Sequence, residues 1–280
     1  RDRDKVFWPA EGYTKGDLLD YYRRIAPWIL PYLAARPLVL TRFPDGIEGK
    51  SFFQHDAPAY ARAFVRTERL YSGDAAKDVT SFIVDDLESL LYVVNLGAIP
   101  LHVWSSRLDD LQRPDWCVID LDPKDAPFSN VVTVARAAHA LAGELGLPLY
   151  VKLTGSTGLH LEIPLGRQVS HAQSRQLAEL LARVLLREVK DVATLARRLD
   201  HREGKVYIDC GQNGHGRLTV CPFAVRPGAG APVAMPLRWH EVVPSLSPRR
   251  YTIKSAVRRM RALADDPVSY THLTLPTIRE

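Results

Sequence analysis

The sequence predicts an α+β protein centred on a split β-α-β-β-α-β sheet of the ferredoxin-like topology, preceded by an N-terminal α/β lobe. In the second half of the chain, four short apolar runs have the length and the β-branched content of strands. Two longer segments among them repeat apolar residues at helical spacing. The strands and helices alternate in the order that this topology requires.

The first half of the chain predicts one helix and several short strands. We expect the helix over residues 14–26, because Thr14 and Asp17 form a T-x-x-D capping box and Pro27 follows. Strands are expected over residues 38–43, 81–84 and 99–104, and polar loops that contain glycine over 44–50 and 71–78.

The second half predicts the split sheet directly. Its expected elements are a strand at 116–122, a helix from Ser129 to Gly146, strands at 149–153 and 158–165, a long helix from about Ser170, a strand at 205–210 and a hairpin partner at 217–223. In the usual strand order 4-1-3-2, the first strand lies between the fourth and the third.

Two carboxylates interrupt the first of these strands. Residues 117–123, CVIDLDP, otherwise have the composition of a buried strand, and burying an ionised carboxylate is costly. Because side chains alternate across a strand, Asp120 and Asp122 share one face, with Cα atoms about 6.6 Å apart. The same alternation and the expected strand order place Asp209 and His160 on that face.

Three carboxylates on one face repel each other unless cations lie between them. Oxygen ligands suit Mg²⁺ or Mn²⁺, and His160 or water could complete a Mn²⁺ site. Two such ions about 3.5–4 Å apart could activate an attacking hydroxyl and stabilise a leaving phosphate. The residues therefore predict a metal site at Asp120, Asp122 and Asp209.

Other classes of protein also use aspartates in this pattern. An EF-hand from Asp120 would need glycine at 125 and glutamate at 131, where the chain has Asp125 and Val131. A sugar-nucleotide transferase with a D-x-D motif and a phosphatase with an aspartate nucleophile stay open. A non-catalytic RNA-binding protein of the same topology would present aromatic residues on its central strands, where this chain has carboxylates.

The TGSTG turn at 154–158 is either a phosphate-binding nest or a plain hairpin turn.

Composition narrows the class of protein. With 46% hydrophobic and 25% charged residues, the chain is typical of a globular protein. No apolar run reaches the ~18–20 residues of a membrane span, and no secretory signal is visible at the N-terminus. Three cysteines without metal-site spacing fit a reducing cytoplasm. The net charge of +5 is compatible with a polyanionic partner, and the basic stretch 249–261 is either a solvated helix face or a phosphate-facing patch.

Eight motifs together resemble one family. They are DKVFWP, YTKGDLLDYY, RFPDGIEGKSFFQ, LHVW, RPDWCVIDLDP, TGSTGLHLEIPL, YIDCGQN and FAVRPGAGAPVAMPL, and they extend from about Asp4 to Ile253. On these residues the chain resembles the polymerase domain of bacterial DNA ligase D, in the archaeo-eukaryotic primase superfamily. The resemblance implies that the RRM/ferredoxin-like sheet is the catalytic sheet of a primase-polymerase.

The resemblance also implies an activity and its partners. The expected protein is a template-directed nucleotidyltransferase that adds nucleotides, preferably ribonucleotides, at double-strand-break ends and short gaps in non-homologous end joining. Its implied cofactor is Mn²⁺ or Mg²⁺, as two ions. Its implied partners are broken or gapped DNA with a 5′-phosphate, NTPs or dNTPs, Ku and a ligase module, in the bacterial cytoplasm at the nucleoid. A catalytically weak module that binds or bridges DNA ends is the alternative.

The resemblance assigns roles residue by residue. The implied catalytic metal ligands are Asp120, Asp122 and Asp209. The implied nucleotide-binding residues are His102, Thr154, Ser156, His160, Gln212 and Arg226. The implied DNA contacts are Lys5 and Lys15 at the 5′-phosphate, Phe52 and Phe53 against template bases, and Arg202 near the primer terminus.

Three positions depart from the family pattern. Thr154 replaces a serine of many members, Thr157 a lysine of some, and Gly228 a basic residue of some. We expect these changes to affect nucleotide affinity more than the type of reaction.

We expect one polymerase unit, with a lobe for DNA ends at 1–115 packed on a catalytic core at 116–265. Ligase and phosphoesterase modules are absent from this sequence, so it is either a stand-alone enzyme or a piece of a longer chain. The tail, 266–280, departs from the family, and residues 267–280 resemble translated sequencing-adapter read-through. We expect this tail to be non-native, or else a short disordered end.

Overall fold

The computed structural model describes residues 2–72 and 76–264, so the expectations about the tail lie outside the described residues. The chain forms two compact units. The first contains residues 1–111, 216–234 and 251–262, and the second contains residues 112–215, 235–250 and, of the described C-terminal residues, 263–264. The first unit thus includes two segments from beyond residue 115, where the sequence analysis divides the lobes. Both units mix helices and strands, as the predicted α+β class requires.

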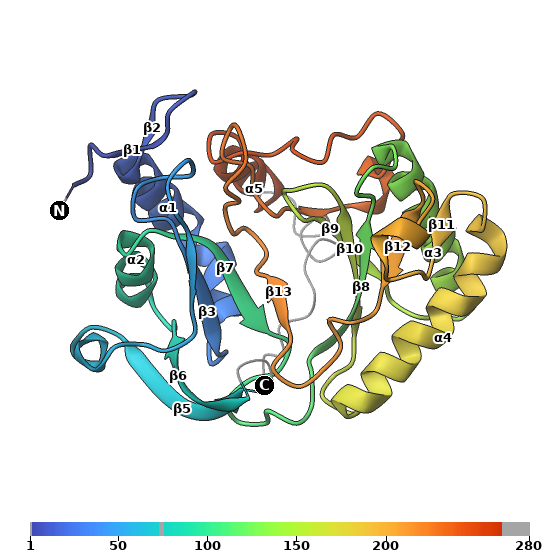
Figure 1. The fold of residues 1–280 in the computed structure, drawn as a ribbon, viewed down its shortest axis with the longest axis horizontal. Coiled ribbons are helices and arrows are strands. Elements are labelled where there is room, and N and C mark those ends of the chain that lie inside the picture. The colour runs from blue at the N-terminus through green and yellow to red at the C-terminus, as the bar shows by residue number, and fades with distance from the viewer. Residues whose placement is uncertain (1, 73–75, 265–280) are drawn as a thin grey trace. The chain divides into compact units, whose positions relative to one another are not determined.

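A six-stranded sheet forms the centre of the second unit, in the order β11-β12-β8-β10-β9-β14. Its strands are β8 (Trp116–Asp122), β9 (Tyr150–Leu153), β10 (Leu159–Pro164), β11 (Ala193–Thr194), β12 (Val206–Asp209) and β14 (Pro236–Leu237). The four strands β12-β8-β10-β9 reproduce the predicted order 4-1-3-2. Figure 1 shows helices α3 (Phe128–Glu144) and α4 (His171–Val189) on one face of this sheet.

Both helices begin close to where the sequence predicts. Ser170 caps α4: its Oγ accepts a hydrogen bond from Gln173 N (3.2 Å), and Gln173 Oε1 accepts one from Ser170 N (2.9 Å). Buried apolar residues of the strands, such as Ile119 and Leu161, are 3% exposed or less. They pack against the buried alanines and leucines of α3 and α4, which fixes one face of the sheet as the core. The opposite face is left to carry polar residues.

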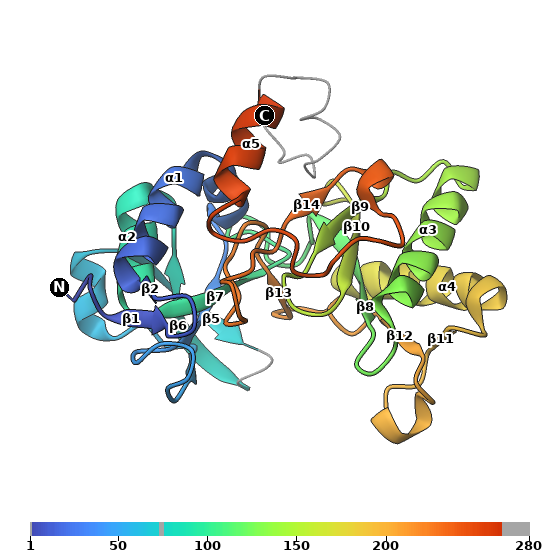
Figure 2. The same cartoon turned by 90° about the horizontal axis from the view of Figure 1, so that it is seen from above.

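The first unit contains a second six-stranded sheet, β13-β7-β3-β6-β5, with β4 paired to β3. Its strands are β3 (Leu38–Arg42), β4 (Phe52–Gln54), β5 (Arg66–Ser72), β6 (Lys77–Ile83), β7 (Ala98–Trp104) and β13 (Leu218–Val220). The hairpin of β1 (Val6–Trp8) and β2 (Tyr13–Thr14) leads into α1 (Lys15–Leu33). Figure 2 shows α1 beside α2 (Leu87–Asn95).

The remaining elements are short. They are α5 (Ala256–Ala264) and the 3-10 helices η1 (Ala59–Ala63), η2 (Leu199–His201) and η3 (Trp239–Glu241). Across residues 2–72 and 76–264, no helix combines the length and the apolar character needed to cross a membrane.

The predicted end of the N-terminal helix is wrong, although its start is right. Thr14 Oγ1 accepts a hydrogen bond from Asp17 N, and Asp17 Oδ2 accepts one from Thr14 N, which completes the capping box. The helix then continues through Pro27 and Pro31 to Leu33. A proline inside a helix costs about 3 kcal/mol. Burial of the apolar face around the two prolines offsets that cost; its members are Ile25, Ile29, Tyr32 and Leu33.

The predicted pairing of residues 217–223 with the strand before them is also wrong. β13 pairs with β7 instead, with Thr219 opposite Val103. β12 has no free edge, because β8 pairs with one side of it and β11 with the other. A hairpin with β12 is therefore blocked, and β13 instead forms the edge of the first unit's sheet.

The polar face of the second unit's sheet buries an ion pair. Lys152 on β9 and Glu162 on β10 are 2% and 4% exposed, and Lys152 Nζ donates a hydrogen bond to Glu162 Oε1. The register places His160 opposite Lys152, so all three side chains share this face. Either charge alone would be costly at this depth, and the two neutralise each other.

Replacing Lys152 alone by methionine should lower the free energy of unfolding by about 3–5 kcal/mol, because it leaves the Glu162 carboxylate buried without a partner. The double variant Lys152→Met, Glu162→Leu should be more stable than this single variant. Urea unfolding of wild type, both single variants and the double variant completes the cycle. If the loss in free energy of unfolding of the double variant equals the sum of the two single losses, the two charges are not coupled.

Candidate active site

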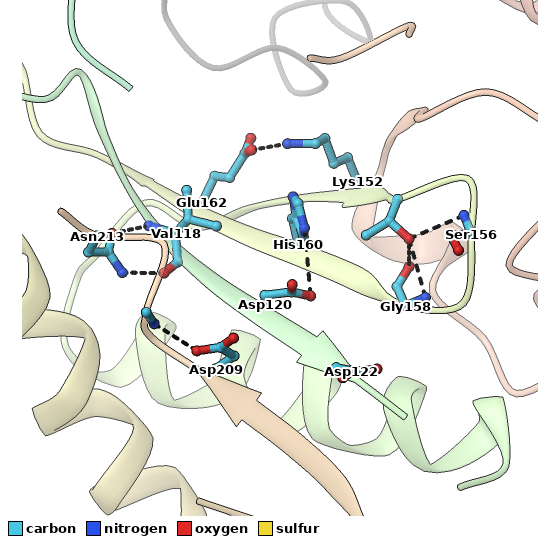
Figure 3. A network of polar contacts seen from close by, with 12 residues as sticks. Val118, Asp120, Asp122, Lys152, Ser156, Gly158, His160, Glu162, Asp209 and Asn213 are labelled. Atoms are coloured by element: carbon cyan, nitrogen blue, oxygen red, sulfur yellow. Dashed lines mark hydrogen bonds and ion pairs between the residues drawn. The ribbon is translucent and has the colours of Figure 1, made fainter. Parts of the chain in front are cut away.

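Three neighbouring strands bring Asp120, His160 and Asp209 into one row across the sheet. The β8–β10 register sets Asp120 opposite His160, and the β8–β12 register sets Asp120 opposite Asp209. Directly opposed residues of antiparallel strands point to the same face, with Cβ atoms about 4.5–5.5 Å apart. Asp122 follows on the same strand and face, and Figure 3 shows the four side chains on one side of the ribbon.

The alternation along β8 separates this row from the core. Cys117, Ile119 and Leu121 are 3% exposed or less, and Cys117 Sγ lies 3.4 Å from Ser174 O on α4. The side chains of Asp120 and Asp122 are 23% and 40% exposed. The carboxylates therefore occupy the face away from the helices, where water or a ligand can reach them.

Each carboxylate of the row has its own partner. Asp120 Oδ1 lies 3.6 Å from His160 Nε2. Asp209 Oδ1 accepts hydrogen bonds from Gly211 N (2.7 Å) and from the Tyr207 hydroxyl (3.3 Å). Burial, and after it the charge of Asp209, raises the pKa of Tyr207 to about 12, so this hydroxyl stays a donor at neutral pH.

Arg202 neutralises Asp122. Its Nη1 donates a hydrogen bond to Asp122 Oδ2 (2.8 Å), and its guanidinium lies 4.2 Å from the centre of the Tyr207 ring. The Lys124 N–H donates a second hydrogen bond, to Asp122 Oδ1 (3.2 Å). The basic loop before β12 thus supplies a cation to the end of β8.

The donor set suits a divalent cation, but its ligands are not assembled. Among the described residues, no three His, Cys, Asp or Glu side chains lie close enough to hold a metal ion. Asp122 is paired with Arg202, and Asp209 is hydrogen-bonded within its own loop. The three carboxylates nevertheless lie on one face, and the buried His160 Nδ1 has no hydrogen-bond partner within 2–72 and 76–264. Hard oxygen donors with one imidazole fit Mg²⁺ or Mn²⁺, provided that Asp122 exchanges Arg202 for the ion.

The TGSTG turn is anchored at the end of β8. Thr154 Oγ1 accepts hydrogen bonds from Ser156 N and Gly158 N (3.3 Å each) and donates one to Gly158 O (3.2 Å). A Cβ at Gly158 would lie 2.1 Å from Leu121 O, so only glycine lets the turn approach β8 this closely. The two N–H groups are directed to Thr154, which leaves them less available for a phosphate.

The other residues that the resemblance singles out fall in both units. His102 on β7 and Arg226 belong to the first unit, and Gln212 lies just after β12 in the second. Phe52 and Phe53 on β4 are 46% and 66% exposed.

Lys5 and Lys15 come together at the start of α1. Lys15 N donates a hydrogen bond to Lys5 O (2.8 Å), and Lys5 Nζ lies 2.6 Å from Asp45 Oδ1. Burial is the largest cause of the lowered pKa of Lys15, and the positive charges of Lys5 and Arg42 lower it further. This corner of the first unit therefore brings two lysines together at a helix N-terminus, with the carboxylates of Asp2 and Asp45 beside them.

Asn213 supports the site, although the sequence analysis did not single it out. Asn213 Oδ1 accepts a hydrogen bond from Val118 N (2.8 Å), and its Nδ2 donates one to Cys210 O (3.1 Å). It ties the loop after β12 to β8 and so holds Asp209 beside Asp120. The available signal was the polar, glycine-rich GQNGHG segment directly after β12.

Comparisons with known proteins all indicate the same family. The family model of the LigD primase-polymerase domain matches residues 14–268. The bifunctional non-homologous end joining protein LigD of Bacillus subtilis is 32% identical over 260 residues, which cover 92% of this chain and 41% of that protein. The multifunctional LigD protein of Pseudomonas aeruginosa is 31% identical over 264 residues, which cover 92% of this chain and 31% of that protein.

A solved structure agrees with this result. The polymerase domain of Mycobacterium tuberculosis ligase D in complex with DNA superposes with a TM-score of 0.87 at 28% identity, over 94% of this chain and 93% of that one. The chain therefore spans less than half the length of the two LigD proteins, but almost all of the solved polymerase domain. Together with the extent of the family match, this shows that the chain belongs to the LigD primase-polymerase domain family.

Proposed function

We propose that this chain is a template-directed nucleotidyltransferase that adds nucleotides at broken DNA ends and short gaps in non-homologous end joining. The observation that carries the proposal is the register that sets Asp120 opposite Asp209, with Asp122 on the same face. A sheet without a cationic ligand gains nothing from like charges in direct opposition. Membership in the LigD primase-polymerase family supports the same reading.

Asp120, Asp122 and Asp209 would hold two divalent ions, Mn²⁺ or Mg²⁺. When bound, such ions lower the pKa of an attacking hydroxyl and stabilise the leaving phosphate. Asp122 would exchange Arg202 for an ion, which frees the guanidinium to lie near the primer terminus. His160, oriented by Asp120 through Nε2, would turn its buried Nδ1 to the incoming nucleotide.

The remaining roles follow the family. The residues proposed to bind the nucleotide are His102, Thr154, Ser156, His160, Gln212 and Arg226. Lys5 and Lys15 would hold the 5′-phosphate of the downstream strand, and Phe52 and Phe53 would stack on template bases. Ku and a ligase module would be the partners that complete end joining, at the bacterial nucleoid.

A second candidate is a module that binds or bridges DNA ends without extending them. One observation favours it: Asp122 is neutralised by Arg202, and no metal cluster is preformed among the described residues. The two candidates differ in a single measurable property, which is incorporation of nucleotides into a primer.

Asp120→Asn or Asp209→Asn should abolish nucleotide addition, because each removes a metal-binding charge while it keeps the shape of the side chain. DNA affinity should stay within a few fold of wild type. Primer extension in Mn²⁺ checks the first statement, and fluorescence anisotropy with labelled DNA checks the second. Asp125→Asn, which changes an exposed aspartate three residues after the end of β8, serves as the control and should extend normally. Extension at close to the wild-type rate by either site variant would refute the metal assignment.

We expect wild type to use ribonucleotides at least as well as deoxynucleotides, because Thr154 retains a hydroxyl that could reach a ribose 2′-OH. That contact requires Thr154 to exchange one hydrogen bond of its turn. Thr154→Val should narrow the ratio of ATP to dATP incorporation, and Thr154→Ser should preserve it. An unchanged ratio in the valine variant would remove Thr154 from this role.

Gapped DNA with a downstream 5′-phosphate should bind roughly tenfold to a hundredfold tighter than the same DNA with a 5′-hydroxyl, because the ammonium groups of Lys5 and Lys15 would both contact one dianion. The double variant Lys5→Ala, Lys15→Ala should erase this preference and still extend a simple primer-template. Lys190→Ala at the end of α4 is the matched control. Titrations belong in low salt, where phosphate contacts persist. Equal binding of the two substrates by wild type would show that the pocket does not exist.

A further inference from the structure

Three aromatic residues gather on the first unit outside every role assigned above. Tyr60 lies on η1, Phe64 directly follows it, and Tyr92 lies on α2. The rings of Phe64 and Tyr92 are stacked, with centroids 5.4 Å apart and planes 14° apart. Tyr60 and Phe64 belong to the same short turn, since Phe64 is the C-cap of η1. We refer to Tyr60, Phe64 and Tyr92 as the aromatic platform.

The platform faces solvent. Tyr60 and Phe64 are 64% and 62% exposed, whereas Ala61 and Val65 beside them are 4% exposed or less. The two buried residues anchor the turn, since Val65 N donates a hydrogen bond to Ala61 O (3.0 Å). Single exposed apolar residues are common on proteins. Phe64 differs from them, because its ring is stacked on Tyr92 and is still largely exposed. Such a ring offers a flat apolar surface on which another ring can stack.

Charges of both signs lie around the platform: Glu88 lies one turn before Tyr92 on α2, whereas the turn that carries Tyr60 and Phe64 is basic. Residues 58–66 contain two arginines and no acidic residue. Arg66 is paired with Glu68 and Asp85, and Arg62 is exposed. Arg42 donates hydrogen bonds to two neutral acceptors, Leu96 O and Gln54 Oε1.

Arg42 also connects the platform to the DNA contacts already proposed. Its guanidinium lies 5.2 Å from the centre of the Phe52 ring. Its Nε donates a hydrogen bond to Leu96 O (2.8 Å), and Leu96 N donates one to Tyr92 O (3.3 Å), so Phe52, Arg42 and the end of α2 that carries Tyr92 lie in one region of the first unit. A DNA strand that stacks on Phe52 would therefore pass close to further aromatic rings and cations.

We propose that the aromatic platform stacks unpaired bases of single-stranded DNA, such as those of an overhang, next to the surface formed by Phe52 and Phe53. Bases in a duplex already stack on one another, so only unpaired bases can use the platform. Stacking on an aromatic ring accepts any base, which suits ends of arbitrary sequence. The platform consists of three residues, whereas a stable protein interface uses about 20–30 residues on each partner. The platform is therefore too small to be a protein-binding surface by itself. The inference rests on the proposed function for its substrate class, but its test does not depend on catalysis.

The test is the affinity of the full chain for a short labelled oligothymidine, measured by fluorescence anisotropy. The double variant Tyr60→Leu, Phe64→Leu keeps apolar volume but removes both rings, and it should bind roughly tenfold weaker or more, as the loss of stacked bases requires. The control is Tyr71→Leu, an equally accessible aromatic residue (56% exposed) farther along β5, which should bind within about twofold of wild type. Thermal unfolding checks that all variants fold.

An abasic oligonucleotide of the same length separates stacking from charge. Its affinity should be the same for wild type and the double variant, because it has phosphates but no bases. Unchanged oligothymidine binding by the double variant would overturn the proposal, as would an equal loss on both ligands. Primer extension by wild type is measured in parallel: if it fails while the stacking result holds, the proposed function is wrong and the platform stands.

Discussion

Repulsion between Asp120 and Asp209 is the constraint around which the second unit's polar face is organised. The strand register makes them direct neighbours, and like charges in that position are destabilising. The chain answers with separate partners: His160 for Asp120, the Gly211 N–H for Asp209 and Arg202 for Asp122. These contacts keep the charges in place without neutralising all of them. A divalent cation is the ligand that such a residual charge would bind.

Other polar groups around the carboxylates are paired, which helps to fix the strands. Lys152 and Glu162 cancel each other, and Asn213 satisfies the backbone of Val118. On the other face, α3 and α4 cover an apolar core that fixes the strands. A site built on strands that are packed in this way can hold its side chains in place.

The strand alternation and the topology could be predicted from the sequence, and with them the shared face of Asp120, Asp122, Asp209 and His160. What could not be predicted depends on partners that are distant in sequence. Arg202 reaches Asp122 across 80 residues, and the pairing of β13 depends on which sheet edge is free. The continuation of α1 past Pro27 could not be predicted either, because burial against residues distant in sequence outweighs the local stop signal of a proline. The aromatic platform likewise joins a turn and a helix that no local motif links.

Direct binding of Mn²⁺ tests the central claim, that the carboxylate row holds divalent cations. Electron paramagnetic resonance counts free Mn²⁺ during a titration and needs neither DNA nor nucleotide. We expect saturable binding to wild type and to Asp125→Asn, and loss of that binding in Asp120→Asn and Asp209→Asn. If the two site variants bind Mn²⁺ as tightly as wild type does, the carboxylate row is not a metal site.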